Sequence, residues 1–333
     1  MKNIVIIGSA NMDTTHYVKE FPNDLTAENE NDIIETRRLL GGKGANQAVS
    51  TVLQSQGTDN KVFFIGFVGK DDAGVEIIKS LQERKIDYSG VKVLPDTKTD
   101  GRIILVNQNG ENRMFGHGEC IKQLTPDSLS DGRMKEVLES ADIVMIQMKM
   151  PAETVEFVIN YCCENNKKLL IDPTPIEKSS LLTEKELISK VTYLTPNEEE
   201  AYALAMYEQG KTREEIKKSM ISITRDKRIE KIRELINKYP NIIATLGDKG
   251  VMYYNNGQIR QRDTYSTKCV DSTGAGDTFN GAFISAIARD TSFETAIDYA
   301  LMDCANKVQY KGAQNGMQTR QQTEKDLEKI NIH

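Results

Sequence analysis

Short runs of β-branched and other apolar residues alternate with amphipathic stretches along most of the chain, and this alternation constrains the fold more than any other feature. The predicted strands are Ile4 to Ile7, Val62 to Phe67, Ile143 to Gln147, Leu169 to Ile171, Val191 to Leu194, Ile242 to Thr245 and Val251 to Tyr254. The predicted helices are Gly44 to Gln54, Ala73 to Arg84, Ala152 to Glu164, Asn197 to Met206, Arg228 to Lys238, Ala275 to Ala288 and Phe293 to Gln309. The pattern is typical of a parallel α/β sheet whose right-handed crossovers place helices on both faces.

Two regions interrupt this alternation. Tyr17 to Leu40 and Lys92 to Phe115 contain extended segments joined by turn residues such as Asn109-Gly110, with no helix between them. We therefore expect a small β-sheet beside the main sheet, covering one of its ends. The stretch from Gln209 to Tyr239 is rich in charges of both signs and predicts a pair of surface helices.

The composition excludes several classes of protein. The chain has 333 residues, which suits one large domain with an appendage, and its net charge of −6 is dispersed, which argues against nucleic acid and membrane as partners. Five cysteines without CxxC spacing indicate neither a disulfide framework nor a zinc site, and three scattered histidines indicate no catalytic triad. No apolar stretch approaches the roughly 18 residues of a membrane span, so we expect a soluble, cytoplasmic protein.

Two glycines stand directly before an aspartate at the start of a predicted helix, in the segment Asp271 to Phe283 (DSTGAGDTFNGAF). Gly274 and Gly276 allow backbone N–H groups to converge, and the helix start adds partial positive charge. Such a site suits a transferring phosphoryl group, and Asp277 at its edge can accept the proton of an attacking hydroxyl. The alternative is a glycine-containing loop in which Asp277 only caps the helix.

A second glycine-rich segment, Gly41 to Ala48 (GGKGANQA), lets the backbone approach a ligand and offers Lys43 and Asn46 as donors. Its spacing is not that of a Walker A loop. A helix start with a merely solvated Lys43 would explain the segment equally simply.

The segment Gly8 to Asp13 follows the first predicted strand but lacks two glycines of a dinucleotide-binding motif. Asn11 and Asp13 instead present an amide and a carboxylate, which suit sugar hydroxyls because these both donate and accept hydrogen bonds. An Asx-turn is the structural alternative.

Polar motifs follow other strands as well, at Asp172-Pro173, Thr195-Pro196-Asn197 and Thr245-Leu246-Gly247. Because ligands of parallel sheets lie at the carboxyl ends of the strands, one crevice can gather all of them. Glu200 at the start of the next helix can orient hydrated Mg²⁺ beside nucleotide phosphates, with Asn197 near the phosphate oxygens. Alternatively, the glutamates there only stabilise the helix N-terminus.

In their order along the chain, these motifs resemble those of the PfkB family of carbohydrate kinases. Lys311 to Gln314 (KGAQ) also fits the ribokinase branch of that family, and the resemblance covers about residues 3 to 320. It implies a single kinase domain over residues 1–333 with a three-layer α/β/α ribokinase-like fold, a mostly parallel central sheet and a small β-sheet lid. The lid would comprise segments about 14–40 and 92–116.

The resemblance also implies an activity and a set of site residues. The enzyme would transfer the γ-phosphoryl of ATP to a sugar hydroxyl, O5 of ribose in the ribokinase branch, with Mg²⁺ and a monovalent cation, K⁺, as cofactors. Asp277 would be the base, and the amides of Gly274, Ala275 and Gly276 would form the anion hole. The sugar would be held by Asn11, Asp13, Gly42, Lys43, Asn46 and Asp277, and the nucleotide by Asn197, Thr245, Gly247 and Gly250. Mg²⁺ would lie near Glu200, and the monovalent cation would be bound, mostly through main-chain oxygens, by Asp271, Thr273, Lys307, Tyr310, Gly312 and Gly316.

The chain departs from the family pattern in two places. Lys149 stands where the ribokinase branch usually carries a glutamate that helps to hold ribose. Either Lys149 turns away to solvent, or the acceptor differs from ribose and carries an anionic group. The lid lacks the usual Gly-Glu-Thr, and Leu25 to Asn31 is polar and lengthened, which bears on lid fit and on the homodimer expected through the lid.

Three functions therefore stay open at this point. The first is a kinase of D-ribose, and the second is a kinase of another small sugar or sugar acid, such as 2-deoxyribose or a ketodeoxy acid. The third is a non-catalytic ligand sensor with the same fold. Asp277, preceded by Gly274 and Gly276, argues against the sensor, since a sensor needs no base.

Overall fold

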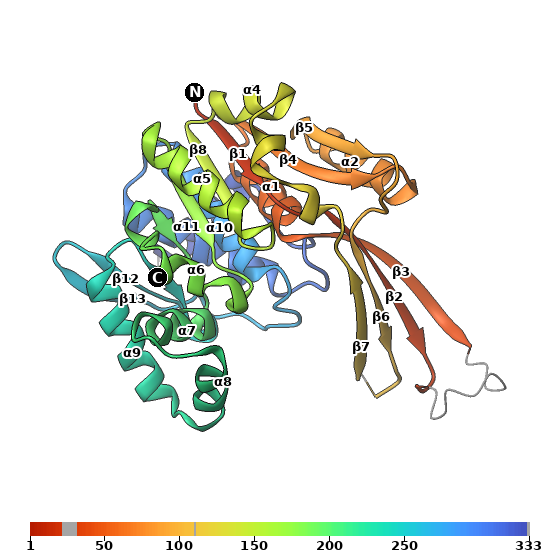
Figure 1. Cartoon of the computed structure of the whole chain (residues 1–333). Helices are drawn as coiled ribbons and strands as arrows, with labels where there is room; N and C mark the ends of the chain where they lie inside the picture. Colours follow the sequence, from red (N-terminus) through yellow and green to blue (C-terminus); the bar gives the residue numbers. More distant parts are fainter. Residues whose placement is uncertain (22–31, 110, 332–333) are drawn as a thin grey trace.

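The computed structural model describes residues 1–21, 32–109 and 111–331 (Figure 1). The strands are β1 (Asn3–Ile7), β2 (Asn11–Val18), β3 (Ile33–Gly41), β4 (Lys61–Gly69), β5 (Asp87–Leu94), β6 (Gly101–Val106), β7 (Asn112–His117), β8 (Ile143–Gln147), β9 (Lys168–Asp172), β10 (Tyr193–Leu194), β11 (Ile243–Thr245), β12 (Val251–Asn255) and β13 (Gln258–Arg262). The helices are α1 (Lys43–Gln54), α2 (Asp72–Glu83), α3 (Pro126–Leu129), α4 (Gly132–Ser140), α5 (Ala152–Glu164), α6 (Ser180–Glu184), α7 (Glu198–Glu208), α8 (Arg213–Ser222), α9 (Arg225–Lys238), α10 (Ala275–Ala288), α11 (Phe293–Lys307) and α12 (Arg320–Asn331). All seven predicted helices and all seven predicted strands have a counterpart in these elements.

Six parallel strands form the central sheet of the described chain, in the order β10-β9-β8-β1-β4-β5. Side chains alternate between the faces of a strand, so Val5 and Ile7 pack into one hydrophobic core and Ile4 and Ile6 into the other. All four are fully buried, and burying a side chain of this size stabilises the fold by about 1.5–3 kcal/mol.

Helices cover both faces of this sheet. Residues of α4, α5, α7 and α9 complete the first core, and residues of α1, α2, α10 and α11 complete the second. In Figure 1, α5 lies in front of the sheet and α10 and α11 behind it. The expected three-layer α/β/α fold is confirmed.

A three-stranded antiparallel sheet, β11-β12-β13, continues the central sheet beyond β10. Parallel bridges from Leu194 to Ile242 and from Asn197 to Thr245 join the two sheets. The prediction of Val251 to Tyr254 as a strand is confirmed, but its parallel direction is wrong, because β12 pairs antiparallel with β11. The connection over residues 246–250 is too short for the crossover that parallel neighbours require.

Four further strands, in the order β3-β2-β6-β7, form a lid that projects from the body (Figure 1). The two predicted extended regions therefore form the small sheet that the sequence indicates. Its bounds differ from those expected, because β2 begins at Asn11 and β5, which overlaps the second region, pairs with β4 in the central sheet. Leu25 to Asn31 and the expected turn residue Gly110 lie outside the described residues.

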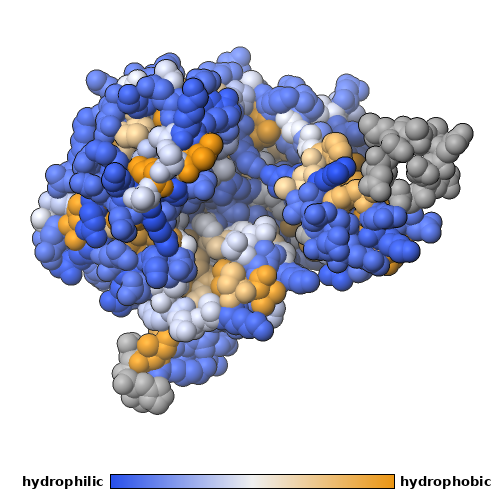
Figure 2. All heavy atoms as spheres, turned by 90° about the horizontal axis from the view of Figure 1, so that it is seen from below, coloured by the Kyte–Doolittle hydropathy of each residue, from blue (hydrophilic) through white to orange (hydrophobic). Residues whose placement is uncertain are grey.

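The charge-rich stretch after Gln209 forms two helices, as predicted. Thr212 caps α8 through a reciprocal pair of hydrogen bonds with Glu215, and α9 follows directly. Figure 2 shows that the side seen from below is mostly hydrophilic, with smaller hydrophobic patches. None of the described helices combines the length and apolar character needed to cross a membrane.

Candidate active site

The predicted motifs meet at the carboxyl ends of the central strands. Gly8 follows β1, Asp172 ends β9, and α1 and α10 begin beside them. The start of α1 lies directly on the end of β1, since Ala45 N donates to Ser9 O at 3.0 Å. A Cβ at Gly44 would collide with the backbone of Gly8, so only glycine fits at this contact.

A partly buried ammonium lies between two carboxylates at the centre of this crevice. Lys43 Nζ is 2.8 Å from Asp172 Oδ2 and 3.1 Å from Asp277 Oδ1. Both aspartates are 3% exposed. The three residues begin α1, end β9 and begin α10, so this ion triad brings together three distant segments of the chain.

Amide side chains donate further hydrogen bonds to the two carboxylates. Asn46 Nδ2 donates to Asp277 Oδ2 at 2.9 Å, and Gln47 Nε2 donates to both Asp172 Oδ2 and Asp277 Oδ1, at 2.9 and 3.1 Å. Gln147 Nε2 in turn donates to Gln47 Oε1 at 2.7 Å, which fixes the orientation of the Gln47 amide. Asp277 is thus held in one position by three donors.

The same contacts decide the ionisation of the triad. Burial raises the pKa of Asp277 and the nearby Asp172 raises it further, whereas Lys43 lowers it, and the net direction is upward. Burial disfavours the charged form of Lys43, but the two aspartates outweigh this and raise the pKa of the ammonium. Lys43 therefore stays charged, and Asp277 is a stronger base than an aspartate in water.

The turn before α10 has the geometry of an anion-binding loop. Gly274 has φ +81° and a Cβ there would collide with Ala313 O, so the turn requires glycine. The amide of Ala275 donates to Ser272 O at 3.0 Å. Among the described residues the amides of Gly274 and Gly276 have no hydrogen-bond partner, which leaves these two N–H groups and the helix dipole available to an anion.

The predicted sugar-binding residues lie where β2 leaves the body for the lid. Asn11 Oδ1 and Asp13 Oδ1 are buried and accept no hydrogen bond from the described residues. Arg102 on the neighbouring strand β6 is 3.6 Å from Asp13. Burial raises the pKa of Asp13, while Arg102 and Lys149 oppose the rise. The two unpaired oxygens are acceptors that sugar hydroxyls could satisfy.

Lys149 follows β8 and faces this site. Its side chain is only partly exposed, and burial lowers the pKa of its ammonium, as do the neighbouring Arg102 and Lys43, while Asp277 and Asp172 raise it. No carboxylate lies within 4 Å of the ammonium among the described residues. The first of the two readings for Lys149, a side chain turned away to solvent, does not match this environment.

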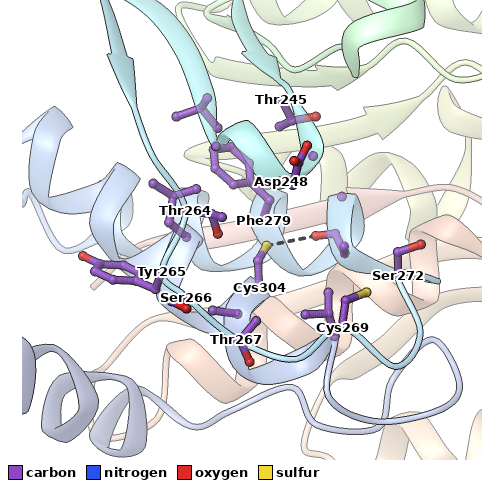
Figure 3. Close-up of a pocket in the computed structure, with 18 residues that line it drawn as sticks. Thr245, Asp248, Thr264, Tyr265, Ser266, Thr267, Cys269, Ser272, Phe279 and Cys304 are labelled. Atoms are coloured by element: carbon purple, nitrogen blue, oxygen red, sulfur yellow. Dashed lines mark hydrogen bonds between the residues drawn. The ribbon is translucent and has the colours of Figure 1, made fainter.

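A pocket of about 480 Å³ lies on the other side of the anion-binding loop (Figure 3). It is lined by Thr245, Gly247 and Gly250, three of the four residues predicted for the nucleotide, and by Ala275 and Gly276 of the loop. Other lining residues follow β13 or lie on α10 and α11: Thr264, Tyr265, Ser266, Thr267, Cys269, Ser272, Phe279, Leu301, Cys304, Ala305 and Val308. A pocket of this volume is large enough for a nucleoside.

The remaining nucleotide residue, Asn197, interacts instead with Glu200. Asn197 Oδ1 accepts from Glu200 N at 2.9 Å, and Glu200 Oε2 accepts from Asn197 N at 3.0 Å, which is a capping box at the start of α7. Thr174 Oγ1 donates to Glu200 Oε1 at 2.6 Å, and Thr174 N donates to Asp172 Oδ1 at 3.2 Å. Burial first, and then Asp172, raises the pKa of Glu200.

The residues expected around a monovalent cation also lie together. The Asp271 carboxylate accepts from the amides of Thr273 and Gly312 at 2.9 and 2.7 Å. Tyr310 N donates to Lys307 O at 3.1 Å, and the aromatic ring of Tyr310 packs against Gly316. The side chain of Lys307 enters this cluster as well.

Comparison with known proteins identifies the family. The profile of the pfkB family carbohydrate kinases matches residues 1–320. The chain belongs to the PfkB family of carbohydrate kinases. A ribokinase of Lactococcus lactis is 30% identical over 334 residues, which covers 100% of this chain and 99% of the relative. The chain is accordingly an ATP:sugar phosphotransferase of the ribokinase type.

Solved structures of other PfkB kinases agree with the fold. The crystal structure of ribokinase from Thermotoga maritima has a TM-score of 0.78 and 29% identity, and the match covers 98% of this chain and 100% of that one. Arabidopsis thaliana ribokinase, solved with ribose and ATP, has a TM-score of 0.77 and 24% identity over 97% of this chain and 98% of that one.

Several residues of the site were not among the sequence predictions. Asp172 was noted only as part of a motif after a strand, and Gln47 only as a letter of GGKGANQA, although both contact Asp277 or its ion partner Lys43. Arg102 gave no signal, because it lies in a lid strand far from any motif. A polar residue directly after a buried strand, as at Asp172, is the one signal that could have been used.

Gly276 offers a direct test of the anion site. Its φ is not positive, and a Cβ built there meets no atom within 4 Å, so nothing in the fold requires glycine. We expect Gly276→Ala to fold with an unchanged or slightly higher melting temperature but to lose kcat by about 10²-fold, since the methyl group enters the space beside the free amides. Gly274→Ala is the matched control and should lower the melting temperature. Full activity of Gly276→Ala would exclude an anion at this turn.

Proposed function

We propose that this kinase transfers the γ-phosphoryl group of ATP to a hydroxyl of D-ribose, giving ribose 5-phosphate. The observation that carries the proposal is Asp277, buried at the start of α10 between the sugar-binding residues and the free amides of the loop. The similarity to ribokinases over the whole chain supports ribose as the acceptor.

The proposed reaction needs one proton transfer and one phosphoryl transfer. Asn11 and Asp13 orient the sugar. A carboxylate oxygen of Asp277 takes the proton of the attacking sugar hydroxyl while the oxygen of that hydroxyl bonds to the γ-phosphorus. The bond from the γ-phosphorus to the β,γ-bridging oxygen breaks, and ADP leaves. The amides of Gly274 and Gly276 stabilise the charge on the transferring group, and the start of α10 adds to this effect.

The described residues could hold Mg²⁺ only if phosphate oxygens of ATP and water supply further ligands. The described residues contain no group of three or more acidic, histidine or cysteine side chains that could hold a metal ion. Each oxygen of Glu200 accepts one hydrogen bond and keeps a second lone pair. Glu200 could therefore hold a hydrated Mg²⁺, which when bound would neutralise charge on the phosphates of ATP.

The general base is tested by Asp277→Asn. We expect kcat with ribose and Mg-ATP to fall by about 10²-fold or more, because an amide cannot take the proton. Asp59→Asn, in the exposed turn between α1 and β4, is the matched control and should leave kcat unchanged. Melting curves confirm that both variants are folded. Near-full activity of a folded Asp277→Asn protein would contradict the proposed mechanism.

Lys149 and Arg102 favour a second candidate, a kinase of a small sugar acid or another acceptor with an anionic group. Arg102 is paired only loosely with Asp13 at 3.6 Å, and the Lys149 ammonium has no carboxylate partner within 4 Å in the described part of the chain. Two cations beside the sugar residues would pair with a carboxylate on the acceptor. A neutral sugar leaves them without such a partner.

An acceptor screen separates the two candidates. ADP release from Mg-ATP is measured with D-ribose, 2-deoxyribose, fructose, adenosine and 2-keto-3-deoxygluconate, for the wild type and Lys149→Glu. If the acceptor is anionic, Lys149→Glu lowers kcat/KM for the acid by at least about tenfold, since a favourable charge pair becomes repulsive. Lys227→Glu, exposed on α9, is the control.

The outcomes of the screen are distinct. Efficient turnover of ribose by the wild type supports the first candidate. Turnover of the acid alone supports the second. If none of the acceptors gives ADP release but one of them binds, the ligand sensor becomes the favoured function.

We also propose a homodimer through the lid. Ile103 and Phe115 face each other on β6 and β7 and are 47% and 64% exposed, on the side of the lid opposite Asp13 and Arg102. A pair of exposed apolar side chains on one sheet face is typical of an interface.

The dimer is tested by light scattering. The wild type should have twice the chain mass of 37.4 kDa, and Phe115→Lys should shift the protein to the monomer because it places a charge in the apolar contact. Ile221→Lys changes a residue of α8 that is 89% exposed and should not alter the mass. A monomeric wild type would contradict the proposal.

We place the enzyme in the cytoplasm, as expected from the sequence. All five cysteines are free thiols in the structure, which supports a reducing compartment.

A further inference from the structure

A fully buried lysine lies beside the turn that leads into α10. Lys307 is the last residue of α11 and its side chain is 0% exposed. Its Nζ donates to the main-chain oxygen of Asp271 at 3.0 Å, the one hydrogen bond this ammonium makes within the described residues. The pocket of Figure 3 is lined by Ser272 and Val308, which directly follow Asp271 and Lys307 in the chain.

A buried ammonium is costly unless charge or dipoles compensate it. Burial lowers the pKa of Lys307, and Asp271 is the largest opposing influence. Burial also raises the pKa of Asp271, but hydrogen bonds from Thr273 and Gly312 and the charge of Lys307 outweigh this, and the pKa is lowered. Lys307 and Asp271 therefore stabilise each other's charged form.

Asp271 connects this lysine to the anion-binding loop. Its carboxylate holds the amides of Thr273 and Gly312, and its own amide donates to Val308 O at 3.0 Å. The segment that carries these bonds ends at Gly274, where the left-handed turn opens the free amides toward the pocket. The position of the anion site thus depends on contacts that meet at Asp271 and Lys307.

A monovalent metal ion does not fit easily at the same place. An ion bound to Asp271 O would lie beside the Lys307 ammonium, and the two like charges would repel each other in a buried setting. Two other carbonyls of the expected ligand set each accept one hydrogen bond, Lys307 O from Tyr310 N at 3.1 Å and Gly316 O from Gln318 Nε2 at 3.1 Å, which leaves each a single lone pair. The main-chain oxygen of Asp271 already contacts a cation that is part of the chain, the Lys307 ammonium.

We propose that the Lys307 ammonium takes the place of the monovalent metal ion, so that the kinase needs no K⁺. Lys307 is then a positioning residue, which acts on the reaction by fixing the Asp271–Gly274 segment and by adding fixed positive charge behind the anion site. The inference rests on the proposed phosphoryl transfer only for its activity measurement.

The wild type should work equally well without small monovalent cations. Turnover in potassium chloride and in tetramethylammonium chloride should agree within about twofold, because the cation is built into the fold. In Lys307→Met, which keeps the length of the side chain and removes its charge, turnover without K⁺ should fall by at least about tenfold and K⁺ should restore part of it. Lys311→Met, exposed on the same turn, is the control and should show neither effect.

A second measurement needs no acceptor and no turnover. Melting temperature and ADP affinity are recorded with and without K⁺ for the wild type, Lys307→Met and Lys307→Arg. K⁺ should stabilise Lys307→Met alone, because only that variant has a vacated cation site. A lysine that merely supports packing would weaken the protein without creating a response to K⁺.

Two results would overturn the inference. One is a wild type whose turnover or melting temperature rises strongly with K⁺. The other is a folded Lys307→Met that retains full activity without K⁺. If Lys307→Met does not fold, the response of the wild type and of Lys307→Arg decides. If no acceptor is phosphorylated, the proposed function fails, and the melting and ADP measurements still test Lys307.

Discussion

The ion triad of Lys43, Asp172 and Asp277 is the interaction on which the rest of the site depends. Two carboxylates so close together, each 3% exposed, cannot both be ionised unless a cation stands between them. The ammonium supplies that cation, and each of the three residues belongs to a different segment of the fold. The triad therefore fixes the start of α10, and with it the base and the anion-binding turn, relative to the central sheet.

The lid and the body divide the work of the site. The body carries Asp277, the free amides and the pocket that we propose for the nucleotide, all on elements that are packed against the central sheet. The lid begins with Asn11 and Asp13 and contributes Arg102 from the neighbouring strand. Changes in the lid can therefore alter which acceptor is bound without disturbing the phosphoryl-transfer machinery, whose contacts lie within the body.

The sequence predicted the layers and the glycine turns well, because both follow from local rules. Apolar periodicity identified α5, α10 and β8 at their observed bounds. It did not predict the direction of β12, which depends on the length of one connection, or β13, whose residues are mostly polar. Lys307 was expected only as one of six residues that bind the cation mostly through main-chain oxygens, because sequence reasoning could not show that its side chain would be buried against Asp271.

Three lysines at the site have different surroundings, and these decide what each ammonium can do. Lys43 has two carboxylate neighbours and stays charged. Lys307 donates to the main-chain carbonyl of Asp271 and is also stabilised by the charge of the Asp271 carboxylate. For Lys149, the charged groups with the largest effect on its pKa are two cations, Arg102 and Lys43.

The incoming phosphates of ATP are negative, and Asp172, Asp277 and Glu200 alone would repel them. Fixed ammonium groups reduce that repulsion and, unlike water, need no reorganisation when the phosphoryl group moves. Lys149 has no carboxylate partner within the described residues, and we therefore propose that it bears on the choice of acceptor rather than on the transfer itself.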